Sequence, residues 1–213
     1  MKDIVIVGAG GFGREVAWLI ERINEVKAEW NLIGFVDDNE EIQGKEVNGY
    51  KVLGNIEWLN NQELYVANAI GDPIVKKKVI ERLNHSKNIY PVLVDPNVIC
   101  SDRVTLGEGS IICAGTIITV NIKVGNHVIV NLDCTIGHDA VLGDYSTILP
   151  SVNISGFANI GECVSIGTSS AVLPSVSIGE NTIVGAGAVV VKDLPANCTA
   201  VGAPAKAIKY HDM

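Results

Sequence analysis

The second half of the chain carries an aliphatic residue at every sixth position, without interruption. The series contains only leucine, isoleucine and valine: Leu106, Ile112, Ile118, Val124, Val130, Ile136, Leu142, Ile148, Ile154, Ile160, Ile166, Val172, Ile178, Val184 and Val190. The position two residues before each of these is small or β-branched. Helices repeat every ~3.6 residues and strands every ~2, so neither element alone produces this period. We predict a parallel β-helix, in which six residues form a short strand and a corner with the aliphatic side chain inside.

Three such sides close a triangular coil of 18 residues, and a second series of residues supports this length. Glycines recur one coil apart and should stack at one corner: Gly107, Gly125, Gly143, Gly161 and Gly179. No residue is inserted between Leu106 and Val190, so we expect no protruding loop, while Val94 and Cys100 extend the register into an imperfect starting coil. The flat outer sides would still expose apolar atoms, which predicts packing into a cyclic homotrimer.

The first ninety residues show a different pattern, in which short apolar runs alternate with helical spacing. We predict strands at residues 3–7, 32–36 and 65–70, a helix whose apolar positions extend to Trp30, and a helix from Pro73 to about Asn84. This alternation implies a small parallel sheet with helices on both faces. Two domains follow: a Rossmann-like α/β domain at residues 1–90, and a β-helix with a C-terminal tail at residues 91–213.

A glycine-rich turn lies between the first predicted strand and helix. Gly8, Gly10 and Gly13 match the G-x-G-x-x-G spacing, and Asp37 stands about where an acidic residue binds a ribose. Backbone N–H groups at a helix start bind any diphosphate, however, and this domain lacks the second half of a nicotinamide site. A nucleotide-sugar diphosphate, NAD, and glycines that only permit a tight turn remain as alternatives.

The sequence has four histidines, and one of them has the surroundings of a general base. His138 stands at a predicted corner beside Asp139, so its imidazole should project outward near a cleft between prisms; a solvated corner histidine is the alternative. Histidine ordinarily titrates near pH 6.5, close to a working pH, which suits proton transfer. We expect His127 to be exposed, His85 to end a helix, and His211 to lie in the tail.

Composition excludes several other classes of protein. Lys+Arg total 16 against 24 Asp+Glu, which gives a net charge of −8, and no basic run could neutralise nucleic-acid phosphates. No apolar run is long enough to enter a membrane and no signal-type segment is present, so we expect a cytoplasmic protein. The cysteines never stand in C-x-x-C spacing, and the histidines cannot converge on zinc as in γ-type carbonic anhydrases, so no metal is expected.

Several motifs carry a family resemblance. VGAGAVVVKDLP and VGAPAK near the C-terminus are typical of hexapeptide acyltransferases, and GAGGFGREV, FVDD and AIGD stand in the first half. With both sets of motifs, the chain resembles one subgroup of these enzymes. That subgroup contains the NeuD-type sialic acid O-acetyltransferases and the PglD-type UDP-amino-sugar N-acetyltransferases of bacterial glycan biosynthesis. The resemblance implies a left-handed β-helix trimer, with acetyl-CoA as co-substrate between neighbouring prisms and a nucleotide sugar on the N-terminal domain.

The resemblance also implies roles for individual residues. His138 would be the catalytic base, Asp139 the neighbour that raises its basicity, and Gly156, one coil later, the backbone N–H that stabilises the oxyanion. The residues implied to bind the cofactor are Thr147, Gly156, Thr168 and Ala186. Those implied to face the nucleotide sugar are Gly10, Gly11, Phe12, Asp37, Asp38 and Gly71.

Three positions depart from the family pattern. Phe12 stands where histidine is frequent, Thr147 where many members have histidine, and Gly137 with Asn131-Leu132 where PglD-type members have glutamate and Asn-His. We expect N-acetylation of a nucleotide-linked 4-amino sugar. The alternatives are O-acetylation of a sugar such as sialic acid and, in another class, a non-catalytic NAD-binding or scaffold module.

Overall fold

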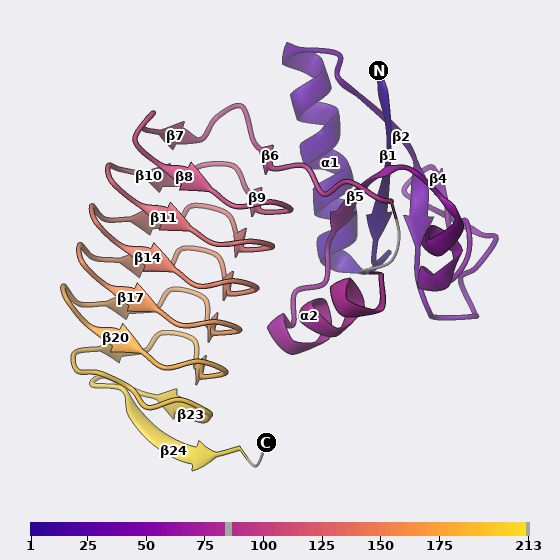
Figure 1. Ribbon diagram of the computed structural model, residues 1–213. Coiled ribbons are helices and arrows are strands. Elements are labelled where there is room, and N and C mark those ends of the chain that lie inside the picture. Colours follow the sequence, from indigo (N-terminus) through magenta and orange to yellow (C-terminus); the bar gives the residue numbers. More distant parts are fainter. Residues whose placement is uncertain (84–86, 212–213) are drawn as a thin grey trace.

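The computed structural model describes residues 1–83 and 87–211 and confirms an α/β part followed by a β-helix (Figure 1). The α/β part is built on a parallel sheet in the order β2-β1-β5. Its strands are β1 (Lys2–Val7), β2 (Trp30–Val36) and β5 (Tyr65–Asn68). Helix α1 (Gly11–Val26) packs on one face of this sheet, and helix α2 (Pro73–Arg82) with the 3-10 helix η1 (Ile56–Asn61) packs on the other.

The first helix ends earlier than its apolar pattern predicted. α1 stops at Val26, and Trp30 begins β2 instead of continuing the helix. The Asn24 side chain explains the reversal, because its Oδ1 accepts from the N–H groups of Glu29 and Trp30 and its Nδ2 donates to the Trp30 carbonyl. An asparagine that captures backbone groups in this way competes with helical hydrogen bonding.

A short hairpin, which the sequence reasoning did not include, follows β2. Its strands are β3 (Glu46–Val47) and β4 (Tyr50–Lys51), paired antiparallel. Asn48 and Gly49 connect them with φ of 47° and 80°. The left-handed conformation of both residues is that of a type I′ turn, for which Asn-Gly is a typical sequence.

The β-helix has three sides, which we call first, second and third in chain order. The first side contains β6 (Leu93–Val94), β9 (Ile111–Ile112), β12 (Ile129–Val130), β15 (Thr147–Ile148), β18 (Ser165–Ile166), β21 (Ile183–Val184), β23 (Cys198–Val201) and β24 (Lys206–Tyr210). The second side contains β7 (Ile99–Cys100), β10 (Ile117–Ile118), β13 (Thr135–Ile136), β16 (Asn153–Ile154), β19 (Ala171–Val172) and β22 (Val189–Val190). The third side contains β8 (Thr105–Leu106), β11 (Lys123–Val124), β14 (Val141–Leu142), β17 (Asn159–Ile160) and β20 (Ser177–Ile178).

The register of these strands confirms the six-residue reading. Ile118 pairs with Ile136 and Ile136 with Ile154, always in parallel and one coil apart. The aliphatic series forms the central core and is buried from Ile112 onward, while Leu106 in the starting coil is partly buried. β6 and β7 supply the predicted starting coil.

The two parts are joined through the first side of the β-helix (Figure 1). Leu93, Ile111 and Ile129 point outward from that side and share a core with α1 and the sheet. Arg22 of α1 donates to both carboxylate oxygens of Asp95, at 2.6 and 3.1 Å. The N-terminal part therefore covers the first side from β6 to β15, whereas the strands from β18 onward and the other two sides are not covered by any described segment.

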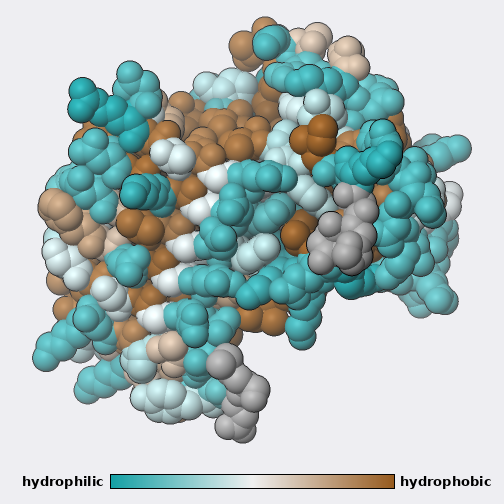
Figure 2. All heavy atoms as spheres, viewed as in Figure 1, coloured by the Kyte–Doolittle hydropathy of each residue, from teal (hydrophilic) through white to brown (hydrophobic). Residues whose placement is uncertain are grey.

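Figure 2 shows apolar side chains in rows on the viewed face of the β-helix, while hydrophilic residues dominate the N-terminal part. Outward-facing Ile99 and Ile117 on the second side and Val141 on the third are exposed. No helix within residues 1–83 and 87–211 combines the length and apolarity needed to cross a membrane.

Candidate active site

His138 lies at the corner between β13 and β14, with its side chain 55% exposed. Its Nδ1 is 2.8 Å from Asp139 Oδ2, so the carboxylate accepts Nδ1–H and leaves Nε2 as the ring atom with a lone pair. Asp139 adopts φ of 59°, the left-handed conformation that turns the chain at this corner. Asn121, one coil earlier, donates to Asp139 Oδ1 at 3.3 Å. Sequence reasoning missed Asn121, although the 18-residue step leads back to it.

Gly156 lies against the imidazole in the next coil. A Cβ atom at Gly156 would stand 2.7 Å from both Cε1 and Nε2 of His138, so only glycine leaves room for the ring in this position. The ring of Phe157 meets His138 edge to face, with centroids 5.1 Å apart. Among the described residues, no hydrogen bond engages the Gly156 N–H. The corner therefore combines an oriented imidazole with an available backbone donor.

The other predicted cofactor residues do not lie at this corner. Thr168 and Ala186 are exposed, one coil apart, at the corner between the first and second sides. Thr147 belongs to β15 on the first side and is 1% exposed, with its Oγ1 accepting from Lys76 Nζ at 2.9 Å. A single chain thus brings together His138, Asp139 and Gly156, and it separates them from Thr147, Thr168 and Ala186.

The glycine turn lies at the carboxyl edge of the three-stranded sheet. A Cβ atom at Gly13 would stand 1.9 Å from the Gly8 carbonyl oxygen, so this glycine permits the close approach of α1 to the turn. Packing does not require glycine at Gly10, Gly11 or Gly71. A Cβ atom at Gly10 or Gly71 would meet no other atom within 4 Å, and one at Gly11 would meet only the end of the Arg14 side chain, at 4.0 Å. The N-cap Gly10 also leaves α1 without a side-chain cap. Open space and uncapped N–H groups suit the approach of an anionic ligand.

The two aspartates after β2 make internal contacts. Asp37 accepts from the N–H groups of Ala9 at 2.8 Å and Asn39 at 2.9 Å, so it braces the glycine turn. Asp38 accepts from the Ile56 N–H at 3.0 Å and from Arg82 Nη1 at 2.9 Å. Burial raises the pKa of Asp38, but these two hydrogen bonds outweigh it and hold the pKa below its usual value. Phe12 is partly exposed and packs on the core beneath α1.

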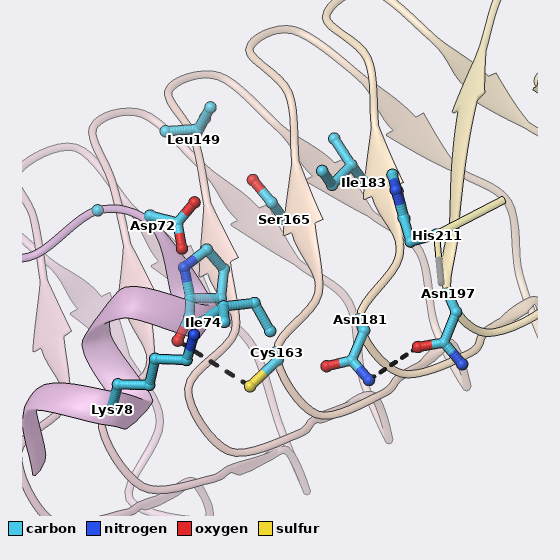
Figure 3. A pocket seen from close by; sticks show the side chains of 12 residues that line it. Asp72, Ile74, Lys78, Leu149, Cys163, Ser165, Asn181, Ile183, Asn197 and His211 are labelled. Carbon is cyan, nitrogen blue, oxygen red and sulfur yellow. Dashed lines mark hydrogen bonds between the residues drawn. The ribbon is translucent and has the colours of Figure 1, made fainter. Parts of the chain in front are cut away.

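A cavity of about 710 Å³ separates the start of α2 from the lower part of the first side (Figure 3). The α/β part contributes Gly71, Asp72, Pro73, Ile74 and Lys78; the β-helix contributes Leu149, Cys163, Ser165, Asn181, Ile183, Asn197 and His211. Asn181 Nδ2 donates to Asn197 Oδ1 at 2.9 Å, which joins two successive coils at the cavity wall. Burial raises the pKa of the Cys163 thiol to about 11, so it is uncharged at neutral pH.

Of the predicted substrate residues, Gly71 alone lines this cavity. Sequence reasoning missed the rest, although the 18-residue step from Thr147 to Ser165 and Ile183 marks the outward positions of the first side. That these strands face α2 follows only from the packing of the two parts.

The prediction for His127 was wrong. Its side chain is buried rather than exposed: it stacks on Tyr145 with centroids 5.4 Å apart and meets the edge of Tyr90 at 5.1 Å. Burial, with a smaller contribution from the Lys76 amine, lowers the pKa of His127 to about 4. His127 is therefore a packing residue. His85 and Asn84 lie outside the described residues.

The part of the chain that the structure describes contains no group of three or more His, Cys, Asp or Glu side chains that could hold a metal ion. His211 lines the cavity and its Nε2 lies 3.0 Å from Thr199 Oγ1.

Comparison with known proteins agrees with this architecture. Residues 3–83 match the PglD N-terminal domain family, and residues 157–192 match the bacterial transferase hexapeptide family (six repeats). The chain is 31% identical to GDP-perosamine N-acetyltransferase of Escherichia coli O157:H7 over 204 residues, which cover 93% of this chain and 82% of the relative.

Two solved structures are similar over almost the whole chain. The acetyltransferase domain of PglB from Neisseria gonorrhoeae FA1090, in complex with acetyl coenzyme A, is 31% identical with a TM-score of 0.88, covering 97% of this chain and 99% of that one. PerB from Caulobacter crescentus, in complex with CoA and GDP-perosamine, is 30% identical with a TM-score of 0.86, covering 98% of both chains. The exposed, carboxylate-paired histidine thus stands on the scaffold of an acyltransferase, and the chain belongs to the PglD-like family of hexapeptide-repeat sugar acetyltransferases.

Proposed function

We propose that the protein is a cytoplasmic homotrimer that transfers the acetyl group of acetyl-CoA to the amine of a nucleotide-linked 4-amino sugar, in bacterial surface-glycan biosynthesis. The observation that carries the proposal is the corner at His138, where the imidazole pairs with Asp139 and lies against Gly156. The relatives support the substrate class, since the PglB domain binds acetyl coenzyme A and PerB binds CoA and GDP-perosamine.

The corner can perform the transfer without an acyl-enzyme. His138 Nε2 takes the proton of the neutral amine as the nitrogen attacks the thioester carbonyl, while Asp139 stabilises the imidazolium that forms. The Gly156 N–H donates to the carbonyl oxygen as it becomes negative. The new C–N bond forms, the C–S bond breaks, and the proton on His138 passes to the departing sulfur. The products are an acetamido sugar and free CoA thiol.

The nucleotide would bind at the carboxyl edge of the N-terminal sheet. The open space at Gly10, Gly11 and Gly71 lets a diphosphate approach the backbone, and the uncapped start of α1 supplies N–H donors. Phe12 and Asp38 flank this edge. Asp37 contributes by bracing the turn, because its two oxygens already accept backbone hydrogen bonds. From Gly71 the cavity continues along the first side and gives the sugar a place.

The proposal requires more than one copy of the chain. The cavity opens on the first side, whereas His138 stands at the opposite corner, between the second and third sides. A second copy packed against the prism would bring its own His138 to the cavity. The exposed apolar rows of the uncovered sides favour such packing. Thr168 and Ala186 line the neighbouring corner and are proposed to bind CoA; Thr147 is left out because it is buried.

A thiol-release assay tests the proposal. The purified protein is incubated with acetyl-CoA and GDP- or UDP-linked 4-amino sugars, and the product is identified by mass spectrometry. We expect an N-acetylated sugar, and we expect His138→Ala to lower kcat by about 10²–10⁴-fold. An unchanged rate in that variant would show that the base is wrong. Acetylation of sugar hydroxyls where amines are inert would indicate an O-acetyltransferase, and sedimentation of a monomer would contradict the shared site.

A further inference from the structure

Lys76 of α2 is a fully buried amine, with 0% of the residue exposed. Its Nζ donates to Thr147 Oγ1 at 2.9 Å and to the Ser146 carbonyl at 3.3 Å. No carboxylate in residues 1–83 and 87–211 forms an ion pair with it. A lysine is almost never fully buried without an ionic partner, so this placement needs a reason.

The reason is not stability. Burial lowers the pKa of Lys76 to about 7, against smaller opposing effects from Cys163 and Asp72. At neutral pH the Lys76 amine is therefore uncharged in a large fraction of the molecules, unlike an ordinary lysine. An apolar side chain of the same length would fill the site without that loss of free energy.

The position of Lys76 connects two walls of the cavity. On its own helix, Pro73, Ile74 and Lys78 line the cavity. Across from α2, its hydrogen-bond partners are Ser146, which precedes β15, and Thr147, which begins it; Leu149 directly after that strand lines the opposite wall of the cavity. One side chain thus bridges the start of α2 and the first side of the β-helix.

We propose that Lys76 is a positioning residue for the acceptor: by hydrogen bonding to β15 it holds the first turn of α2 at the distance from the β-helix that the cavity requires. This inference rests on the proposed function, because it assigns the cavity to the acceptor sugar. Lys76 itself touches no reacting atom.

Lys76→Met tests the proposal, since methionine keeps the length of the stem and removes the donor. We expect the KM for the acceptor to rise about tenfold, because a misplaced wall weakens productive binding, while kcat and the KM for acetyl-CoA stay within about threefold. Thr147→Val removes the acceptor of the same hydrogen bond and should give the same selective rise. Lys77→Met is the matched control, because the adjacent lysine also joins α2 to the β-helix, at Glu162, but this ion pair is solvent-exposed and should contribute little.

A purely structural lysine predicts a different result. In that case Lys76→Met would leave the acceptor KM unchanged wherever the variant is folded. The proposal is overturned if neither Lys76→Met nor Thr147→Val raises the acceptor KM. Melting temperatures at pH 6 show whether folding is retained. A rise in acceptor KM in a variant that is at least as stable as the wild type supports positioning.

A second readout does not depend on the proposed function. Cys163 is buried beneath α2, with Sγ 4.0 Å from the Pro73 carbonyl. If Lys76 holds the turn, Lys76→Met should accelerate alkylation of Cys163 several-fold in peptide mass spectrometry, with the exposed Cys100 as internal reference. Unchanged Cys163 reactivity overturns the positioning of α2. Faster alkylation in a protein whose wild type acetylates no amino sugar would overturn the proposed function alone.

Discussion

Two corners of the β-helix carry a histidine, and they differ in what covers them. At the His138 corner the imidazole is exposed, paired with Asp139 and flanked by the next coil. At the His127 corner the imidazole is stacked on Tyr145, closed by Tyr90 and near Lys76. The repeat projects both rings outward, so the packing of the N-terminal part decides which ring meets solvent. An outward position in a coil is therefore a candidate for chemistry only while that side stays uncovered.

The partners at the two corners also come from different places. Asn121, Gly156 and Phe157 all belong to neighbouring coils, so the register brings them to His138. At His127, Lys76 comes from α2 and Tyr90 from the segment that connects the two parts, while Tyr145 belongs to the next coil. The contacts at the His138 corner therefore come from within the β-helix. The burial of His127 depends on contacts between the N-terminal part and the β-helix.

The largest effect should come from crowding the exposed corner. In Gly156→Ala the added Cβ would stand 2.7 Å from two ring atoms of His138 and displace the imidazole, so we expect kcat to fall about 10²-fold. Steady-state thiol release measures it. Pro174→Ala, one coil further along the same corner, is the control and should keep full activity. Equal activity of Gly156→Ala and wild type would mean that the ring works from another position.

At the covered corner, the contact between α2 and the β-helix should make stability depend on pH, because it buries Lys76. Its pKa in the folded protein is about 7, below the ordinary value, so the unfolded chain binds a proton that the fold excludes. The free energy of unfolding of the wild type therefore rises with pH above about 7. Below pH 7 the full cost of burying the charged amine applies. The difference in melting temperature between Lys76→Met and wild type should be larger at pH 6 than at pH 9 by about 5 °C. Equal differences at the two pH values would show that the buried amine does not titrate.

The smallest effect should be the acid response of His127. Its pKa of about 4 lies below the ordinary value, so the neutral ring contributes stability that is lost as the pH falls from about 6.5 toward 4. His127→Phe cannot bind this proton, so between pH 7 and pH 5 it should lose about 2 kcal/mol less than the wild type in urea unfolding. Its kcat should match the wild type within about twofold, unlike that of His138→Ala. Parallel loss of stability in both proteins would contradict the buried, neutral ring.

Much of this molecule was predictable because the repeat is local. Pairing of Ile118 with Ile136, and the position of Gly156 against His138, follow from counting along the chain. Two of the errors fall where contacts cross between parts, and one is local. The local error is Trp30, which fitted the helical period but bonds to the Asn24 side chain in a turn. His127 looked exposed because Tyr90 and Lys76, which lie outside the coils, were not yet placed. Thr147 was assigned to a ligand, and in the fold it receives a hydrogen bond from Lys76.

The sequence by itself determined the β-helix and the geometry of the His138 corner. An unbroken six-residue period admits one stacking of coils, because a slip of one residue would turn the aliphatic core outward. Only the tertiary structure decided which outward residues are covered, where the cavity lies and what Lys76 bonds. Those contacts join α2 to β15 and β18, segments far apart in the chain, and no local period encodes the distance between them.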